Sequence, residues 1–68
     1  MRYAVVIEMA AGNYSAYVPD LPGCVATGAT IAAAEEKIRA AIRFHNEGLR
    51  AEGVEVPQPA SIAKYVQA

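Results

Sequence analysis

The sequence is poor in the side chains that fill a protein core. Its 68 residues include no tryptophan, one phenylalanine and two leucines, and 15 of its hydrophobic residues are alanines, which add little volume. A domain of this size buries only about 60% of the surface that its unfolded chain exposes, so its stability is marginal. We therefore expect the chain to work by association, either with copies of itself or with another protein.

Other absences exclude whole classes of protein. Six basic and seven acidic residues leave a net charge of −1, without the basic stripe of an autonomous nucleic-acid binder. No apolar run approaches the roughly 20 residues of a membrane span, and Glu8 appears before a signal-peptide core can develop. The single cysteine, Cys24, excludes an internal disulfide and a cysteine-based zinc site. These features favour a cytoplasmic protein.

Local signals predict four strands and one helix. Pro22 and Gly23 suit the central positions of a type II turn, because proline fixes φ and glycine allows a positive φ. Thr30 is a predicted helix N-cap, and Gly53 fits the left-handed position after the helix end. Lys64 indicates that the last strand lies at or near a sheet edge. The predicted order is strand 2–9, turn 10–13, strand 14–18, strand 24–27, helix 30–52 and strand 62–66.

The helix is predicted to be amphipathic. Apolar positions recur at steps of three and four residues and form one stripe along it. On the opposite face, the spacing predicts the ion pairs Glu35–Arg39 and Arg43–Glu47. The stripe consists of Ile31, Ala34, Ile38, Ala41, Ile42, His45 and Leu49.

The predicted fold class is α+β, with a mainly antiparallel sheet and one long helix on one face. One helix can cover only one face of the sheet. Val6 and Tyr17 would then lie on the uncovered face. That face, or an edge of the sheet, is the expected surface for a homo-oligomer, either a dimer or a tetramer.

The residues between the second strand and the helix resemble a family motif. Residues 14–28 read YSAYVPDLPGCVATG: a strand, a Pro-Asp-Leu-Pro-Gly-Cys turn, a short strand and a glycine, followed by a helix that begins at a threonine. This pattern is similar to that of the HicB-like antitoxins, and the resemblance extends over roughly residues 3–67. Ala33 stands where the family commonly has a glutamate, so Thr30 lacks the partner of a capping box.

The resemblance implies a fold, a partner and a function. HicB-like domains have a β-β-β-α-β arrangement described as partial ribonuclease H-like. They are antitoxins of type II toxin–antitoxin systems, and they bind HicA toxins, small mRNA interferases whose catalytic surface they block sterically. Full-length members usually carry a C-terminal DNA-binding segment. This sequence ends directly after the last predicted strand, so we expect one domain over 1–68, without that segment and without direct DNA binding.

Few residues suggest a site. Asp20, with Leu21 and Tyr17, is the predicted partner-binding set, a small acidic and apolar surface for a basic RNA-cleaving protein. Asp20 also fits a structural role, accepting hydrogen bonds from backbone N–H groups of its own turn. Cys24 and His45 are expected to be packed structural residues. No metal ion or cofactor is predicted.

Two other functions stay open as alternatives. A degenerate ribonuclease H-like nuclease would need several carboxylates around metal ions, and only Glu8 and Asp20 lie in the strand and turn regions. The hypothesis is therefore that the protein is not an enzyme. The second alternative is a stand-alone regulatory or scaffold protein that has no toxin.

Overall fold

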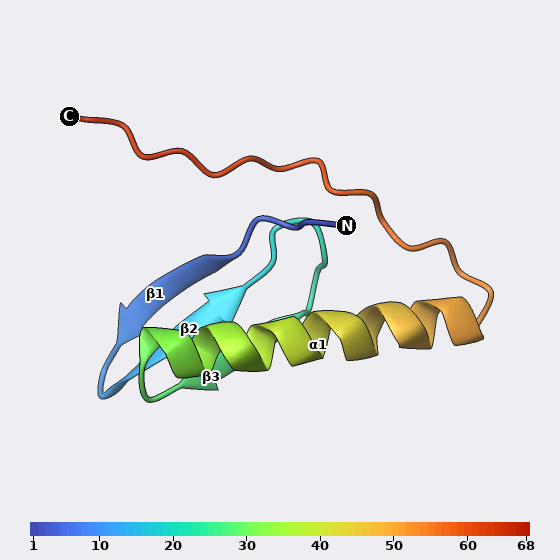
Figure 1. Cartoon of the computed structure of the whole chain (residues 1–68), viewed down its shortest axis with the longest axis horizontal. Helices are drawn as coiled ribbons and strands as arrows, with labels where there is room; N and C mark the ends of the chain where they lie inside the picture. Colours follow the sequence, from blue (N-terminus) through green and yellow to red (C-terminus); the bar gives the residue numbers. More distant parts are fainter.

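Three strands and one helix make up the regular structure. The computed structural model describes all of residues 1–68 and places the elements in the order β1 (Val6–Ala10), β2 (Asn13–Tyr17), β3 (Val25–Gly28) and α1 (Ile31–Ala51). The strands form an antiparallel sheet of order β1-β2-β3, and α1 crosses one face of it (Figure 1). The predicted α+β class, the antiparallel sheet and the single long helix are confirmed. No helix is long and apolar enough to cross a membrane.

The loop between β2 and β3 is built from two consecutive turns. The N–H of Leu21 donates to the carbonyl of Val18, and the N–H of Cys24 donates to the carbonyl of Leu21, both at 3.1 Å. Gly23 has a φ of 82°, as the third position of a type II turn requires. The prediction of this turn from Pro22-Gly23 is therefore confirmed.

Both ends of α1 have the predicted caps. Oγ1 of Thr30 accepts a hydrogen bond from the N–H of Ala33 at 3.0 Å. At the other end the N–H of Val54 donates to the carbonyl of Leu49, and Gly53 has a φ of 73°. This pattern is a Schellman motif, which satisfies carbonyls that the helix leaves without partners.

The ion pairs on α1 differ in part from the prediction. Arg39 binds Glu35 at 3.0 Å, as expected, but its second partner is Glu36 on the same face. The predicted pair Arg43–Glu47 is not formed. Both pairs of Arg39 are exposed, so they contribute little to stability.

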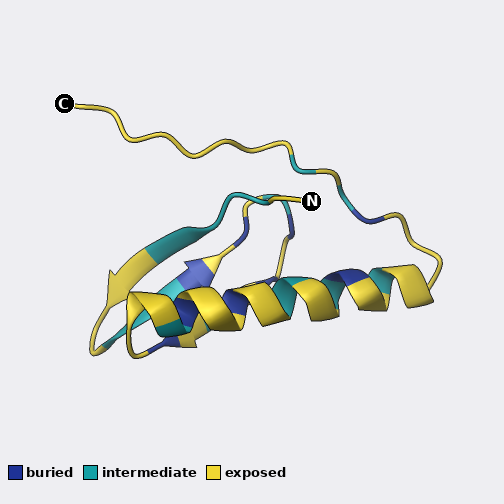
Figure 2. Ribbon diagram, viewed as in Figure 1, coloured by how far each residue is buried: buried dark blue, intermediate teal, exposed yellow.

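The core is small and lies between β2, the loop after it and the first half of α1 (Figure 2). Only 9 of 68 residues are buried, which fits a sequence rich in alanine and poor in leucine and aromatic residues. Gly28 lets α1 approach β3 closely, because a Cβ there would lie 2.8 Å from the carbonyl carbon of Ala33. The core residues are Ala16, Val18, Leu21, Cys24, Ala34 and Ile38.

The predicted fourth strand, residues 62–66, is wrong for the single chain. Residues 54–68, here called the C-terminal segment, form no strand, so the order is β-β-β-α. The segment runs back from the end of α1, past the N-terminus (Figure 1). Strand propensity reflects how well a side chain fits a pleated, half-buried surface. Ile62, Tyr65 and Val66 are exposed, so they are not packed on such a surface.

The first half of the C-terminal segment is nevertheless fixed to the domain. Val56 is buried, and the hydroxyl of Tyr3 donates a hydrogen bond to the carbonyl of Pro57 at 2.6 Å. The buried Asn46 of α1 donates from Nδ2 to the same hydroxyl at 3.4 Å. Helix, N-terminus and C-terminal segment therefore meet at Tyr3.

Candidate interaction surface

The face of the sheet opposite α1 carries an apolar row. The register pairs Val6 with Tyr17 and Tyr17 with Val25, so the three side chains lie side by side across the strands. Their neighbours along the strands belong to the other face, where Ala16 contributes to the core under α1. Tyr17 is 40% exposed and Val25 is 66% exposed. The prediction that Val6 and Tyr17 lie on the uncovered face is confirmed.

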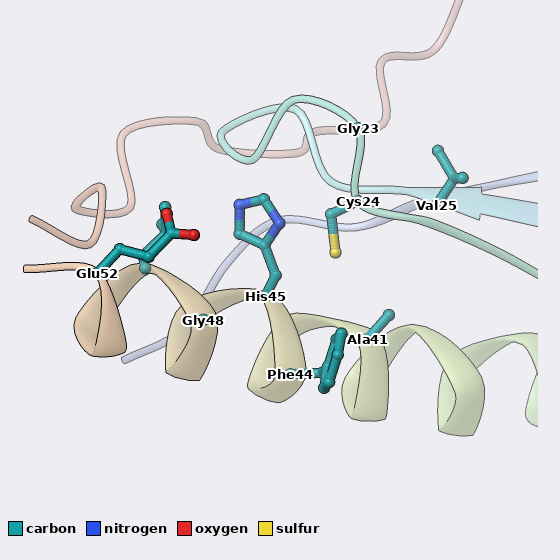
Figure 3. A pocket seen from close by; sticks show the side chains of 9 residues that line it. Gly23, Cys24, Val25, Ala41, Phe44, His45, Gly48 and Glu52 are labelled. Atoms are coloured by element: carbon teal, nitrogen blue, oxygen red, sulfur yellow. The ribbon is translucent and has the colours of Figure 1, made fainter. Parts of the chain in front are cut away.

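An open hollow lies on the helix side of the sheet, between the start of β3 and the second half of α1 (Figure 3). Val25 is among its lining residues, although its side chain points away from α1. Phe44, on the helix, is 81% exposed. We call Tyr17, Val25 and Phe44 the β3-side surface. The hollow is lined by Gly23, Cys24, Val25, Ala41, Phe44, His45, Gly48, Leu49 and Glu52.

The β3-side surface consists of exposed apolar and aromatic side chains. Exposed apolar patches on proteins mark contact with other molecules, and tyrosine and phenylalanine are enriched in the centres of protein interfaces. Sequence reasoning missed Phe44. A signal was present, because the only phenylalanine of the chain lies off the apolar stripe of the helix.

Asp20 is bound by the chain's own C-terminal segment. Its Oδ2 accepts hydrogen bonds from the N–H groups of Ala60 at 2.9 Å and Ser61 at 3.0 Å, and its Oδ1 accepts one from the Ser61 hydroxyl at 2.7 Å. The Ala60 N–H, followed by the two Ser61 donors, lowers the pKa of Asp20 below its ordinary value. The donors come from about 40 residues away, so the expected bonding to its own turn is wrong.

The three residues predicted to bind a partner have different surroundings. Leu21 is fully buried in the core, because the loop between β2 and β3 folds over it. Its side chain therefore supports the loop from below and does not reach the surface. Tyr17 is exposed on the open sheet face, and the carboxylate of Asp20 is occupied by Ala60 and Ser61. The structure brings Tyr17 together with Val25 across the sheet.

Cys24 and His45 line the hollow without forming a reactive pair. Cys24 is buried, as predicted, and burial raises the pKa of its thiol above the ordinary value, which keeps it protonated. His45 is half-buried on α1 and makes no hydrogen bond with the thiol. Glu8 is exposed on β1, and no group of three or more His, Cys, Asp or Glu side chains is placed to hold a metal ion.

Comparison with family models assigns the chain to one family. A family model described as "HicB_like antitoxin of bacterial toxin-antitoxin system" matches residues 3–68, essentially the whole chain. An uncharacterized 14.9 kDa protein from the rep-hol intergenic region of Haemophilus phage HP1 (strain HP1c1) is 36% identical over 66 residues. The match covers 97% of this chain and 50% of that protein. The chain therefore spans about half the length of the curated relative that it matches.

Proposed function

We propose that this chain, which belongs to the HicB-like antitoxins, is the antitoxin of a bacterial type II toxin–antitoxin pair. The observation that carries the proposal is the family match over residues 3–68, which includes the whole sheet, the loop before β3 and the helix. We further propose that its partner is a HicA-type mRNA interferase, met in the cytoplasm. The antitoxin would block the toxin sterically, with no chemistry of its own.

The β3-side surface is the proposed place of contact. Tyr17 pairs with Val25 across the sheet, Phe44 lines the same hollow as Val25, and all three are exposed. A few aromatic side chains carry most of the binding energy in typical interfaces. Glu52 lines the same hollow and supplies negative charge for a basic, RNA-binding partner. Asp20 and Leu21 remain in the proposed partner-binding set. Leu21 would act indirectly, because its buried side chain sets the shape of the loop. A basic toxin side chain would reach the Asp20 carboxylate by replacing Ser61.

Co-expression with the neighbouring reading frame tests the function. That frame alone should stop growth, and this chain should restore it by forming a complex that copurifies. A neighbour that is harmless alone, or that stays toxic when this protein is present, contradicts the proposal and favours a stand-alone regulatory or scaffold protein.

Substitution on α1 tests the surface. Phe44→Asp should weaken toxin binding by roughly 30-fold or more, the effect of losing an interface hot spot. Ala32→Asp is the matched control, because Ala32 is also an exposed apolar residue of α1 but lies at the other end of the helix. Calorimetry of both variants should show the loss for Phe44→Asp alone. Equal losses would place the contact elsewhere.

A further inference from the structure

The chain exposes more surface than a compact protein of its mass. Its accessible surface is 5166 Å², whereas a folded monomer of 7.2 kDa is expected to expose about 4,100 Å². Its radius of gyration is 12.9 Å, against about 11 Å for a compact chain of this length. The surplus of about 1,000 Å² is close to the roughly 800 Å² that each partner contributes to a standard interface.

The end of the C-terminal segment contributes strongly to this surplus. Ser61 is the last residue that takes part in any hydrogen bond, so Ile62–Ala68 have every backbone donor and acceptor unpaired. Ile62, Tyr65 and Val66 are 82%, 105% and 86% exposed. Isoleucine, tyrosine and valine all favour β-strands. An extended apolar stretch with unpaired backbone is suited to pair with the edge of a sheet.

The β1 side of the sheet offers such an edge. β1 pairs only with β2, so its outer N–H and C=O groups have no strand partner. Beside it lies an apolar hollow, lined by Val5, Ile7, Met9, Tyr14, Ile31 and the chain's own Tyr65. Protein domains commonly bind extended peptides by adding a strand to an open edge and placing alternate side chains in adjacent pockets.

We infer that Ile62–Ala68 of one copy pairs with β1 of a second copy, and that the reciprocal exchange makes a two-fold symmetric dimer. Each chain carries an open β1 edge and one unpaired segment, so a symmetric pair satisfies both. Within one chain, Asp20 holds the start of the segment at Ala60 and Ser61, and Ile62–Ala68 make no hydrogen bond with β1. The exchange also covers an open strand edge that would otherwise invite aggregation.

The inferred dimer does not depend on the proposed antitoxin function. The dimer uses β1, at one edge of the sheet. Val25 and Phe44 of the β3-side surface line the hollow beside β3, at the other edge. A toxin bound at Tyr17, Val25 and Phe44 could therefore be carried by each chain of the dimer. Measurements on the protein alone test the dimer, and binding of the toxin tests the function.

Light scattering after size-exclusion chromatography tests the exchange. The full chain should have twice the mass of 7.2 kDa, and a chain ending at Ser61 should have the mass of a monomer. The double variant Lys64→Pro/Tyr65→Pro should also be a monomer, because consecutive strand N–H groups point to opposite sides and proline removes both. Phe44→Ser is the control, since it removes an exposed apolar side chain from the other surface, and it should remain a dimer.

Amide hydrogen exchange identifies the segment involved. Ile62–Val66 should be protected in the full chain and lose protection on dilution, and the double proline variant should keep the helical circular dichroism of the full chain. A full chain that stays monomeric overturns the inference, whether or not the segment is protected by its own β1. A dimer that persists in the double proline variant overturns it as well.

Discussion

Residues 1–53 and residues 54–68 are held by different kinds of contact. The first region has strand ladders, a capped helix and a core. The second is attached at three places: the buried Val56, the Tyr3–Pro57 hydrogen bond, and the bonds from Ala60 and Ser61 to Asp20. Both regions contain β-branched and aromatic residues. Strands form only in the first region, where each has a neighbouring strand to pair with. Strand propensity alone is therefore not enough to form a strand.

The largest expected effect is a loss of stability in residues 1–53, caused by a substitution in the core. Ile38 is among the largest fully buried side chains, and Ile38→Ala should lower the free energy of unfolding by about 2–5 kcal/mol, because it removes apolar contacts and leaves a cavity. Urea titration followed by circular dichroism measures the loss. Phe44→Ala on the same helix is exposed and should change stability by at most about 0.5 kcal/mol. Similar losses for the two variants would contradict the position of the core.

A pair of glycines tests the packing of α1 on β3. Gly28→Ala should lower the free energy of unfolding by about 1–3 kcal/mol, because its Cβ would press against the backbone of Ala33 and Ala34. Gly48→Ala should raise it by up to about 1 kcal/mol, because Gly48 lies inside α1 with open space where a Cβ would be. Thermal unfolding of the two variants checks the opposite signs. A rise in both would contradict the close approach at Gly28, and a fall in both would contradict the open space at Gly48.

Loss of the Asp20 hydrogen bonds should have the smallest effect on global stability, because it releases only residues 54–68. Because the folded pKa of Asp20 is lowered, its bonds to Ala60 and Ser61 are fully present above the unfolded value of about 3.8 and are lost as the pH falls through the folded value. Asp20→Ala should remove them at any pH. Amide exchange at Ala60 and Ser61 should then quicken, with α1 unchanged. Slow exchange in Asp20→Ala would show that Val56 and Pro57 hold the segment without this carboxylate.

Features set by neighbouring residues could be predicted from the sequence. The Pro22-Gly23 turn, the Thr30 cap and the helix end at Gly53 all lie where expected, because each involves hydrogen bonds between groups only a few residues apart. The first strand is the exception. It begins at Val6, although the apolar pattern predicted a start at residue 2. Val6 pairs with Tyr17, the last residue of β2, so residues 2–5 have no ladder partner.

The candidate site could be predicted only in part. Alternation along the strands placed Tyr17 on the uncovered face, since a helix shields one face and side chains alternate between the two. The sequence hypothesis also put Leu21 on the surface, with Asp20 and Tyr17, as the apolar part of a contact with a basic partner. It is buried because the loop closes over it, with the N–H of Val18 bonded to the carbonyl of Cys24 at 3.3 Å.

By itself, the sequence determined the turns, the caps, the length of the helix and the family, all of which depend on residue types at short spacing. Only the tertiary structure decided that Ser61 binds Asp20, that Phe44 and Val25 line one hollow, and that Ile62–Ala68 stay unpaired. Those outcomes depend on which distant segments meet. Their contacts form between residues far apart in the chain, where local preference carries no information about the partner.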